Sequence, residues 1–271
     1  MKIKEIPVSL LYQSYLSLKS IEKLTSDKKQ IPVIISLTSI PTRFNILHLT
    51  IRSILNQNVL PEKIILWLNE NHKDNIPNSL KQLECNFFKI RFSNLDCPHL
   101  KLVESLRHYP RKIIITLDDD LMYRQNWLNY LYMEHLEHPK SIIANQTRII
   151  SFDQEGTIKP YEQWPTNYNA KIKTKLLLPI GSAGALYPPN SLNSKVLDDN
   201  LFLKLAPRAD DLWFKAMSLL NNTDSIQSSR LTGAPIPIWG SQEIALKKSN
   251  IGQDKNRLQW QALTNYFNLK L

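Results

Sequence analysis

The chain has 271 residues, a formal net charge of +10 and a pI near 9.5, with 42% hydrophobic and 21% charged residues. This composition is typical of a soluble globular protein with one sizeable domain. It excludes a disulfide framework or a cysteine-rich zinc site, because Cys85 and Cys97 are the only cysteines. No apolar run approaches the roughly 20 residues that span a bilayer, and charges interrupt the first residues too often for a secretion signal. We therefore expect a cytoplasmic protein with reduced thiols.

The glycines and the charge narrow the function classes further. With six glycines, the sequence contains neither the G-x-G-x-x-G fingerprint of a dinucleotide site nor a P-loop. The positive charge favours nucleic acid, an anionic membrane surface or phosphorylated substrates as partners. The lysines and arginines are spread out, and no nucleic-acid-binding motif is present. We therefore expect an enzyme that handles anionic substrates, with possible peripheral contact with an anionic membrane and no nucleic acid; a merely solubilising surface is the alternative.

The expected elements begin with a helical N-terminal extension over residues 1–30, where apolar residues recur near helical spacing. Strand-like and helix-like segments then alternate up to residue 120, which predicts a parallel sheet with crossover helices. The strands are expected at 32–38, 63–68, 88–92, 113–117 and 141–145, and the helices at 44–55, 102–108 and 127–132. A hydroxyl and a proline in residues 39–43 are expected to begin the helix at 44–55. Beyond residue 150 we expect mixed strands and loops packed against the first half.

Three consecutive aspartates, Asp118, Asp119 and Asp120, directly follow the strand-like run at 113–117. Open α/β sheets bind their ligands at the carboxyl ends of strands. Carboxylates so close repel one another unless a cation or a proton neutralises them, and Mg²⁺ or Mn²⁺ is the natural partner for such oxygen ligands. If the chain stays extended there, Asp118 and Asp120 point to one side and Asp119 to the other. A solvated acidic turn is the alternative.

Two further segments carry residues suited to a binding site. Asp210 and Asp211 begin a segment with apolar residues at helical spacing, and one of them is expected to cap that helix. The run 181–184 contains Gly181 and Gly184, and glycine permits close approach of a ligand to the backbone. Such a loop could let a sugar lie against the backbone, or it could simply be a tight turn before a strand at 185–187.

Six short segments carry the resemblance to a known family, at 36–43, 96–101, 116–120, 160–164, 179–189 and 209–214. In their order and spacing they resemble GT-A fold glycosyltransferases of the type that builds bacterial capsule or lipopolysaccharide. The resemblance implies an α/β fold with a mainly parallel sheet flanked by helices. It also implies one domain over 31–271, with a nucleotide-sugar-binding half at 31–150 and a mixed acceptor half at 151–271.

The resemblance implies a role for individual residues as well. The metal, Mn²⁺ or Mg²⁺, would be held by Asp120 and Asp118. The donor, favoured to be a UDP-sugar, would contact Thr38, Ser39, Arg43, Asp96, Lys101, Asp118 and Asp119. The acceptor, a glycan or lipid-linked glycan, would contact Tyr161, Trp164, Gly181, Ser182, Gly184 and Trp213.

Catalysis would fall to Asp211 as general base, with Asp210 capping or orienting, although the assignment between the two aspartates stays open. A base opposite the leaving group implies inversion at the anomeric carbon. The sequence departs from the family in one respect, because its last histidine is His138 and none follows Asp211 to complete the metal site. The alternative is a non-catalytic basic module for anionic polysaccharide or nucleic acid, which would explain the charge but not the two acidic clusters.

Overall fold

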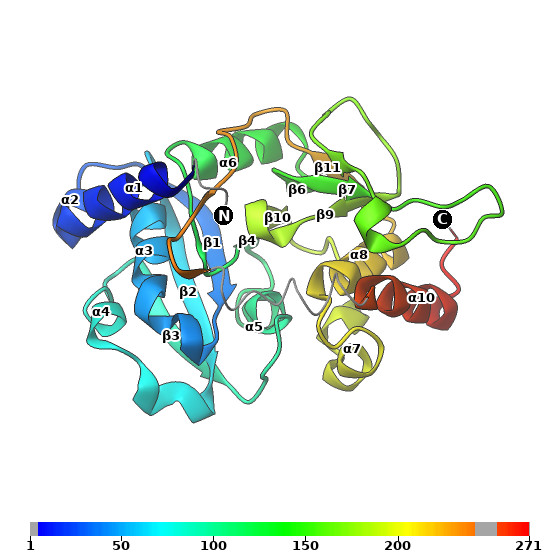
Figure 1. Ribbon diagram of the computed structural model, residues 1–271, viewed down its shortest axis with the longest axis horizontal. Helices are drawn as coiled ribbons and strands as arrows, with labels where there is room; N and C mark the ends of the chain where they lie inside the picture. The colour runs from blue at the N-terminus through cyan, green and yellow to red at the C-terminus, as the bar shows by residue number, and fades with distance from the viewer. Residues whose placement is uncertain (1–4, 242–253, 271) are drawn as a thin grey trace.

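The computed structural model describes residues 5–241 and 254–270, and its centre is a seven-stranded sheet flanked by helices (Figure 1). The strand order is β11-β6-β10-β4-β1-β2-β3. All neighbouring pairs are parallel except those of β10, which runs antiparallel to both β4 and β6. The strands are β1 (Gln30–Thr38), β2 (Leu60–Asn69), β3 (Phe88–Ser93), β4 (Ile113–Thr116), β6 (Ile142–Ala144), β10 (Ala185–Tyr187) and β11 (Ser225–Gln227). This confirms the expected α/β fold with a mainly parallel sheet.

Helices cover both faces of the sheet, because the strands are apolar on both faces. Along β1, Val33 and Ile35 pack into one core cluster and Ile34 into the other. The first cluster takes side chains from α3 (Phe44–Leu55), α4 (Asn78–Lys81) and α6 (Trp127–Glu137). The second takes them from α5 (Leu100–His108), α7 (Asp199–Leu205), α8 (Asp210–Leu220) and α10 (Lys255–Phe267). The expected helices at 44–55, 102–108 and 127–132 are therefore confirmed, with small extensions at their ends.

The strand order reverses between β1 and β4. From β1 the chain adds β2 and then β3 on one side, and then returns to place β4 on the other side of β1. In open α/β sheets the crevice outside the carboxyl ends of strands at such a reversal is the usual ligand site. Thr38 ends β1, and Asp118 lies two residues beyond the end of β4. The residues expected to bind the donor therefore lie at the place where this topology binds ligands.

Two small sheets complete the second half of the chain. One pairs β12 (Ile236–Pro237) with β5 (Leu121–Met122), and the other has the order β8-β7-β9. The strands of the second sheet are β7 (Thr147–Ile149), β8 (Thr166–Asn167) and β9 (Leu177–Pro179). Short 3-10 turns lie at Pro41–Arg43, Glu70–Asn75, Tyr161–Gln163, Gly181–Ala183 and Ser194–Leu197. The mixed character expected beyond residue 150 is confirmed, whereas the proposed domain boundaries stay predictions.

The N-terminal segment contains α1 (Ile6–Leu18) and α2 (Ile21–Thr25). α1 lies against α3 at one end of the molecule (Figure 1), and Leu16 is its buried apolar contact. Most of its other large apolar side chains are exposed, Leu11 to 73% and Leu18 to 86%. None of the described helices is long and apolar enough to cross a membrane.

Candidate active site

The aspartate triplet is anchored to the loop that follows β1. The Arg43 guanidinium contacts Asp119 Oδ1 at 2.5 Å and Asp120 Oδ2 at 3.3 Å. Ser39 Oγ donates a hydrogen bond to Asp119 Oδ2, and Thr50 Oγ1 donates one to the Asp119 carbonyl at 2.8 Å. The Ser39 hydroxyl therefore binds a carboxylate, and no side chain caps the 3-10 turn or α3, contrary to the expectation of a capping hydroxyl. These contacts hold together the ends of the two strands that flank the topological reversal.

The three aspartates do not alternate as an extended chain would. β4 ends at Thr116 and the chain turns at Asp119 and Asp120. As a result Asp119 and Asp120 share Arg43, while Asp118 pairs with a different cation, Lys101. The predicted grouping of Asp118 with Asp120 on one side was conditional on an extended chain, and that condition is not met because the turn removes the strand periodicity.

Lys101 joins the two acidic clusters into one site. Its Nζ lies 3.0 Å from Asp118 Oδ1 and 3.1 Å from Asp210 Oδ2, and the residue is 5% exposed. Burial by itself would lower the pKa of Lys101, but the carboxylates of Asp118 and Asp210 hold that pKa well above its usual value. The ammonium is therefore charged at neutral pH. The aspartates after β4 and the aspartates at the start of α8, about 90 residues apart in the chain, thus meet around one cation.

Asp211 contacts the loop at Gly181. Both of its carboxylate oxygens accept the Gly181 backbone N–H, at 3.1 and 3.2 Å. A Cβ at position 181 would lie 2.9 Å from Asp211 Oδ1 and 3.6 Å from Lys101 Nζ, so glycine is needed for this approach. Gly181 therefore contacts Asp211, the expected general base. The group that closely approaches the backbone of this loop is the Asp211 carboxylate.

The carboxyl groups of Asp210 and Asp211 have opposite electrostatic environments. Burial and the neighbouring Asp210 raise the pKa of Asp211 to about 8. Burial would also raise the pKa of Asp210, but Lys101 and His99 hold it below its ordinary value. The N-terminus of a helix normally favours the charged carboxylate, and at Asp211 burial and a like-charged neighbour outweigh that effect. A pair with separated pKa values suits one carboxylate to proton transfer and the other to a permanent charge.

Sequence reasoning missed Tyr123, which links the triplet to the 181–184 loop. Its buried hydroxyl accepts a hydrogen bond from the Asp118 backbone N–H at 3.1 Å and donates one to the Ser182 carbonyl at 2.8 Å. His99 was also missed. It is fully buried beside Asp210, its ring stacks on Phe202 at 4.4 Å, and burial lowers its pKa to about 4. No sequence signal distinguishes such a tyrosine or histidine from an ordinary core residue.

The donor atoms and charges of the site fit a divalent metal. Five carboxylates, at positions 118–120, 210 and 211, surround the cations of Arg43 and Lys101. Burial, together with Asp118 and Asp119, raises the pKa of Asp120 to about 6 although Arg43 lowers it. The excess of negative charge is what a hard divalent cation with oxygen ligands would neutralise. The ligands predicted for that metal are Asp118 and Asp120, whose side chains are 38% and 13% exposed, and in this structure they bind separate cations, Lys101 and Arg43.

The aromatic residues expected to bind the acceptor are mostly core residues. Trp164 is 1% exposed with its Nε1 donating to the Lys159 carbonyl, and Trp213 is fully buried with its Nε1 donating to the Val196 carbonyl. A sugar cannot stack on a ring that is covered by protein, so the acceptor role is contradicted for both tryptophans. Tyr161 is 9% exposed, and burial with nearby Asp211 raises its pKa to about 12.

The remaining expected residues divide between the site and its surroundings. Gly184 has φ of +101°, and a Cβ there would lie 2.4 Å from Trp127, so this glycine accommodates a core tryptophan, and its contact with an acceptor stays a prediction. Ser182 is partly exposed and its backbone binds Tyr123. Thr38 is partly exposed at the end of β1. Asp96 is exposed in the loop before α5 and forms no hydrogen bond or ion pair with the described residues.

The fold and the site together define an α/β protein with an acidic centre at its topological reversal, where such folds bind their ligands. Residues 40–202 match the model of the family described as glycosyl transferase family 2. The chain belongs to glycosyl transferase family 2, and its fold is the GT-A fold. Membership of this family supports a glycosyltransferase with a nucleotide-sugar donor and disfavours the non-catalytic binding module. Enzymes of this family commonly use a divalent metal.

The other comparisons add little to this assignment. No curated protein matches the chain. Among solved structures, the chain is similar to 4-diphosphocytidyl-2C-methyl-D-erythritol synthase from Anaerococcus prevotii DSM 20548, with 12% sequence identity and a TM-score of 0.46. That match covers 87% of this chain and 98% of the other. A likeness this distant carries no information about activity, so the family assignment rests on the sequence match.

Proposed function

We propose that this protein is an inverting, metal-dependent glycosyltransferase that moves a sugar from a UDP-sugar to a hydroxyl of a capsule, lipopolysaccharide or other surface glycan. One observation carries the proposal: Lys101 brings Asp118, from the expected metal and donor cluster, together with Asp210, the neighbour of the expected base. A donor bound at the triplet would therefore present its anomeric carbon near Asp211. Family membership supports the nucleotide-sugar donor, and the choice of UDP follows the sequence resemblance.

In the proposed reaction Asp211 is the general base. It accepts the proton of the acceptor hydroxyl while that oxygen forms a bond to the anomeric carbon. The bond from this carbon to the diphosphate oxygen breaks, and its electron pair stays on the diphosphate. Asp211 is held by the Gly181 N–H, and Asp210 and Lys101 are positioning residues that set its charge environment. A divalent metal held by Asp118 and Asp120 would supply Lewis-acid stabilisation of the departing diphosphate.

The experiment is a donor screen. The purified protein is incubated with Mn²⁺ and a panel of UDP- and GDP-sugars, and release of the nucleoside diphosphate is followed with and without mixed glycan acceptors. We expect turnover of a UDP-sugar that Asp211→Asn reduces by about 10²–10⁴-fold, the usual contribution of a general base. Asp199→Asn is the matched control, because Asp199 also begins a helix but pairs with Arg107 outside the site. Retention of the donor's anomeric configuration in the product would overturn the inverting mechanism, and equal activity of both variants would overturn the role of Asp211.

We further propose that α1 lies on an anionic membrane at its cytoplasmic face, where a lipid-linked acceptor would be found. α1 contains no charged residue, and Leu10, Leu11 and Leu18 are 45%, 73% and 86% exposed. Lys19 follows it directly, and Lys23 lies four residues further on in α2. Exposed apolar side chains beside basic ones are typical of helices in the membrane interface.

Co-sedimentation with phosphatidylglycerol vesicles tests this placement. We expect the full chain to bind these vesicles and not phosphatidylcholine vesicles, and we expect Leu11→Glu with Leu18→Glu to abolish binding. Leu258→Glu is the matched control, because Leu258 is 57% exposed on α10. Equal loss of binding in the control, or equal binding to both lipids, would contradict a specific role for α1.

A further inference from the structure

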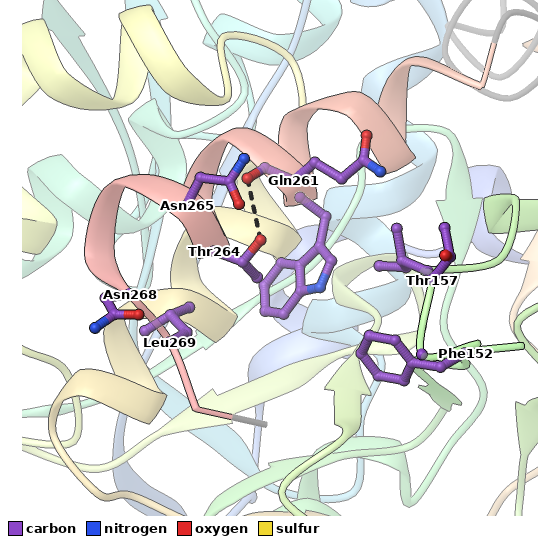
Figure 2. A pocket seen from close by; sticks show the side chains of 10 residues that line it. Phe152, Thr157, Gln261, Thr264, Asn265, Asn268 and Leu269 are labelled. Atoms are coloured by element: carbon purple, nitrogen blue, oxygen red, sulfur yellow. Dashed lines mark hydrogen bonds between the residues drawn. The ribbon is translucent and has the colours of Figure 1, made fainter. Parts of the chain in front are cut away.

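A cavity of about 560 Å³ lies between α10 and the loop at residues 152–158 (Figure 2). Cavities of this size fall within the range of roughly 300–1,000 Å³ that holds small ligands in proteins. One wall consists of Gln261, Thr264 and Asn265 on α10, with Asn268 just beyond its end. The opposite wall includes Phe152 and Thr157, which Figure 2 shows facing the helix across the cavity.

The loop wall is held in place by its own hydrogen bonds. Asp153 Oδ1 accepts the backbone N–H groups of Glu155 and Thr157, at 3.0 and 2.8 Å. The Asp153 N–H in turn donates to the Thr157 carbonyl at 2.9 Å, and Phe152 pairs with Ile158 in a β-bridge. The cavity is therefore preformed, which lowers the entropic cost of binding a ligand there.

The lining residues are neutral, and several have unused hydrogen-bonding capacity. None of the ten residues that line the cavity is charged. Within the described residues, the side-chain amides of Gln261, Asn265 and Asn268 form no hydrogen bond with protein. Each amide can donate and accept. A phosphate or a polyanion would find no lining cation here, despite the net positive charge of the chain.

Trp260 supplies a buried donor that lacks an acceptor. It is fully buried and lines the cavity, and its Nε1 has no hydrogen-bond partner among the described residues. The indole Nε1 atoms of Trp67, Trp127, Trp164 and Trp213 all have protein acceptors. A buried donor without a partner destabilises the folded protein. A ligand oxygen that reached this N–H would recover that free energy.

The cavity lies on the half of the molecule that carries the base. The Trp260 ring contacts Trp164 with centroids 6.5 Å apart, and Trp164 contacts Tyr161 at 5.0 Å. The charge of Asp211 acts on the Tyr161 hydroxyl. In addition α10 packs on α8, the helix that begins with Asp210 and Asp211. A ligand in the cavity would therefore be near the reacting acceptor and away from the aspartate triplet.

We propose that this cavity is a second sugar-binding site, which holds a neutral sugar residue of the acceptor glycan remote from the hydroxyl that reacts. A neutral sugar combines apolar C–H faces, which suit the partly exposed ring of Phe152, with hydroxyls that both donate to and accept from amides. The assignment to an acceptor glycan rests on the proposed function, whereas the affinity for neutral sugar rests on the cavity alone.

The test uses the ¹H–¹⁵N spectrum of the six tryptophan indoles in the full chain, with the Trp260 resonance assigned by Trp260→Phe. Lactose, N-acetyllactosamine and maltose are titrated to about 50 mM, roughly 50-fold above a millimolar Kd. We expect at least one of them to move the Trp260 indole N–H downfield in a saturable manner, while Trp67 stays unmoved because its N–H is already donated to Ser105 at 2.8 Å. No shift of Trp260 with any of the three, or a shift with a heparin oligosaccharide alone, would overturn the inference.

Variants separate this inference from the proposed function. Gln261→Ala with Asn265→Ala should weaken sugar binding about tenfold through two lost hydrogen bonds, and Thr264→Trp should abolish it by filling the cavity. Gln259→Ala is the matched control, because its amide binds Arg208 N outside the cavity. All of these variants should still bind UDP with Mn²⁺. Sugar binding without any donor turnover would refute the proposed function alone, whereas turnover with an acceptor KM unchanged in the cavity variants would refute the acceptor site alone.

Discussion

Removing the Lys101 ammonium should destabilise the protein in a way that depends on pH. Lys101→Met keeps the length of the side chain but leaves Asp118 and Asp210 without their shared cation. Breaking a buried ion pair by removing one partner costs about 3–5 kcal/mol, because the other charge stays buried and unpaired. For a chain of this size that corresponds to a fall in Tm of about 6–20 °C. The exposure of Asp118, 38%, places the cost toward the lower end of the range.

The sign of the pH dependence follows from Asp210. In the native protein Lys101 holds the pKa of Asp210 below its unfolded value, so this pair stabilises the fold above that unfolded pKa and the contribution is lost in acid. In Lys101→Met the remaining burial raises the pKa of Asp210 above its unfolded value. The variant should therefore lose most stability relative to the native protein at pH 7–8 and little near or below the unfolded pKa of about 4.

Urea unfolding at pH 4 and pH 8 measures the effect. Lys112→Met is the control, because its ammonium pairs with Glu62 at the surface and should contribute at most about 1 kcal/mol. Adding Asp210→Asn to Lys101→Met should restore part of the stability by removing the unpaired charge. If Lys101→Met behaved like the control at both pH values, the idea that one cation holds the two acidic clusters together would be refuted.

Three further predictions follow from the site. In the free enzyme kcat/KM should rise with pH through about 8 as Asp211 loses its proton. The residual kcat/KM of Asp211→Asn should not show this rise with pH. Binding of Mn²⁺, followed by electron paramagnetic resonance, should weaken as pH falls below about 6, because Asp120 becomes protonated; unchanged affinity at pH 5 would exclude Asp120 as a ligand. Gly184→Ala should lower the unfolding free energy by about 2–4 kcal/mol, because of the positive φ and the clash of the new Cβ with Trp127. The control Gly240→Ala should lower it by about 1 kcal/mol, because its Cβ would meet no atom within 4 Å.

The sequence predicted the parts of the fold that have strong local patterns. The strands near β1, β2, β3 and β4 and the helix α3 carry continuous apolar runs or clear helical periodicity, and they lie close to where these patterns place them. The position of β10 between β4 and β6, antiparallel to both, could not be predicted. Its three residues carry no signal for which neighbours they join, because strand order depends on contacts remote in the chain.

The site shows the same division between local and remote information. The acidic residues at 118–120 and 210–211 were identified because carboxylates cluster at the ends of apolar elements, whereas Arg43 and Lys101 were implied by the family resemblance. The structure brings all of them together. The role of Trp164 was misjudged because a tryptophan suits both a core and a sugar-binding face, and its own neighbours in sequence do not show which. The packing constraint on Gly184 could not be predicted because it comes from Trp127, 57 residues away in the chain.

The proposed activity requires the aspartate triplet to hold a metal and a nucleotide together. Calorimetric titration of UDP and of GDP, each with and without Mn²⁺, into the wild-type protein, Asp120→Asn and the control Asp199→Asn tests it most directly. We expect Mn²⁺-dependent binding of UDP that is retained in Asp199→Asn and lost in Asp120→Asn. Binding of UDP that is independent of Mn²⁺ and unchanged in Asp120→Asn would contradict it.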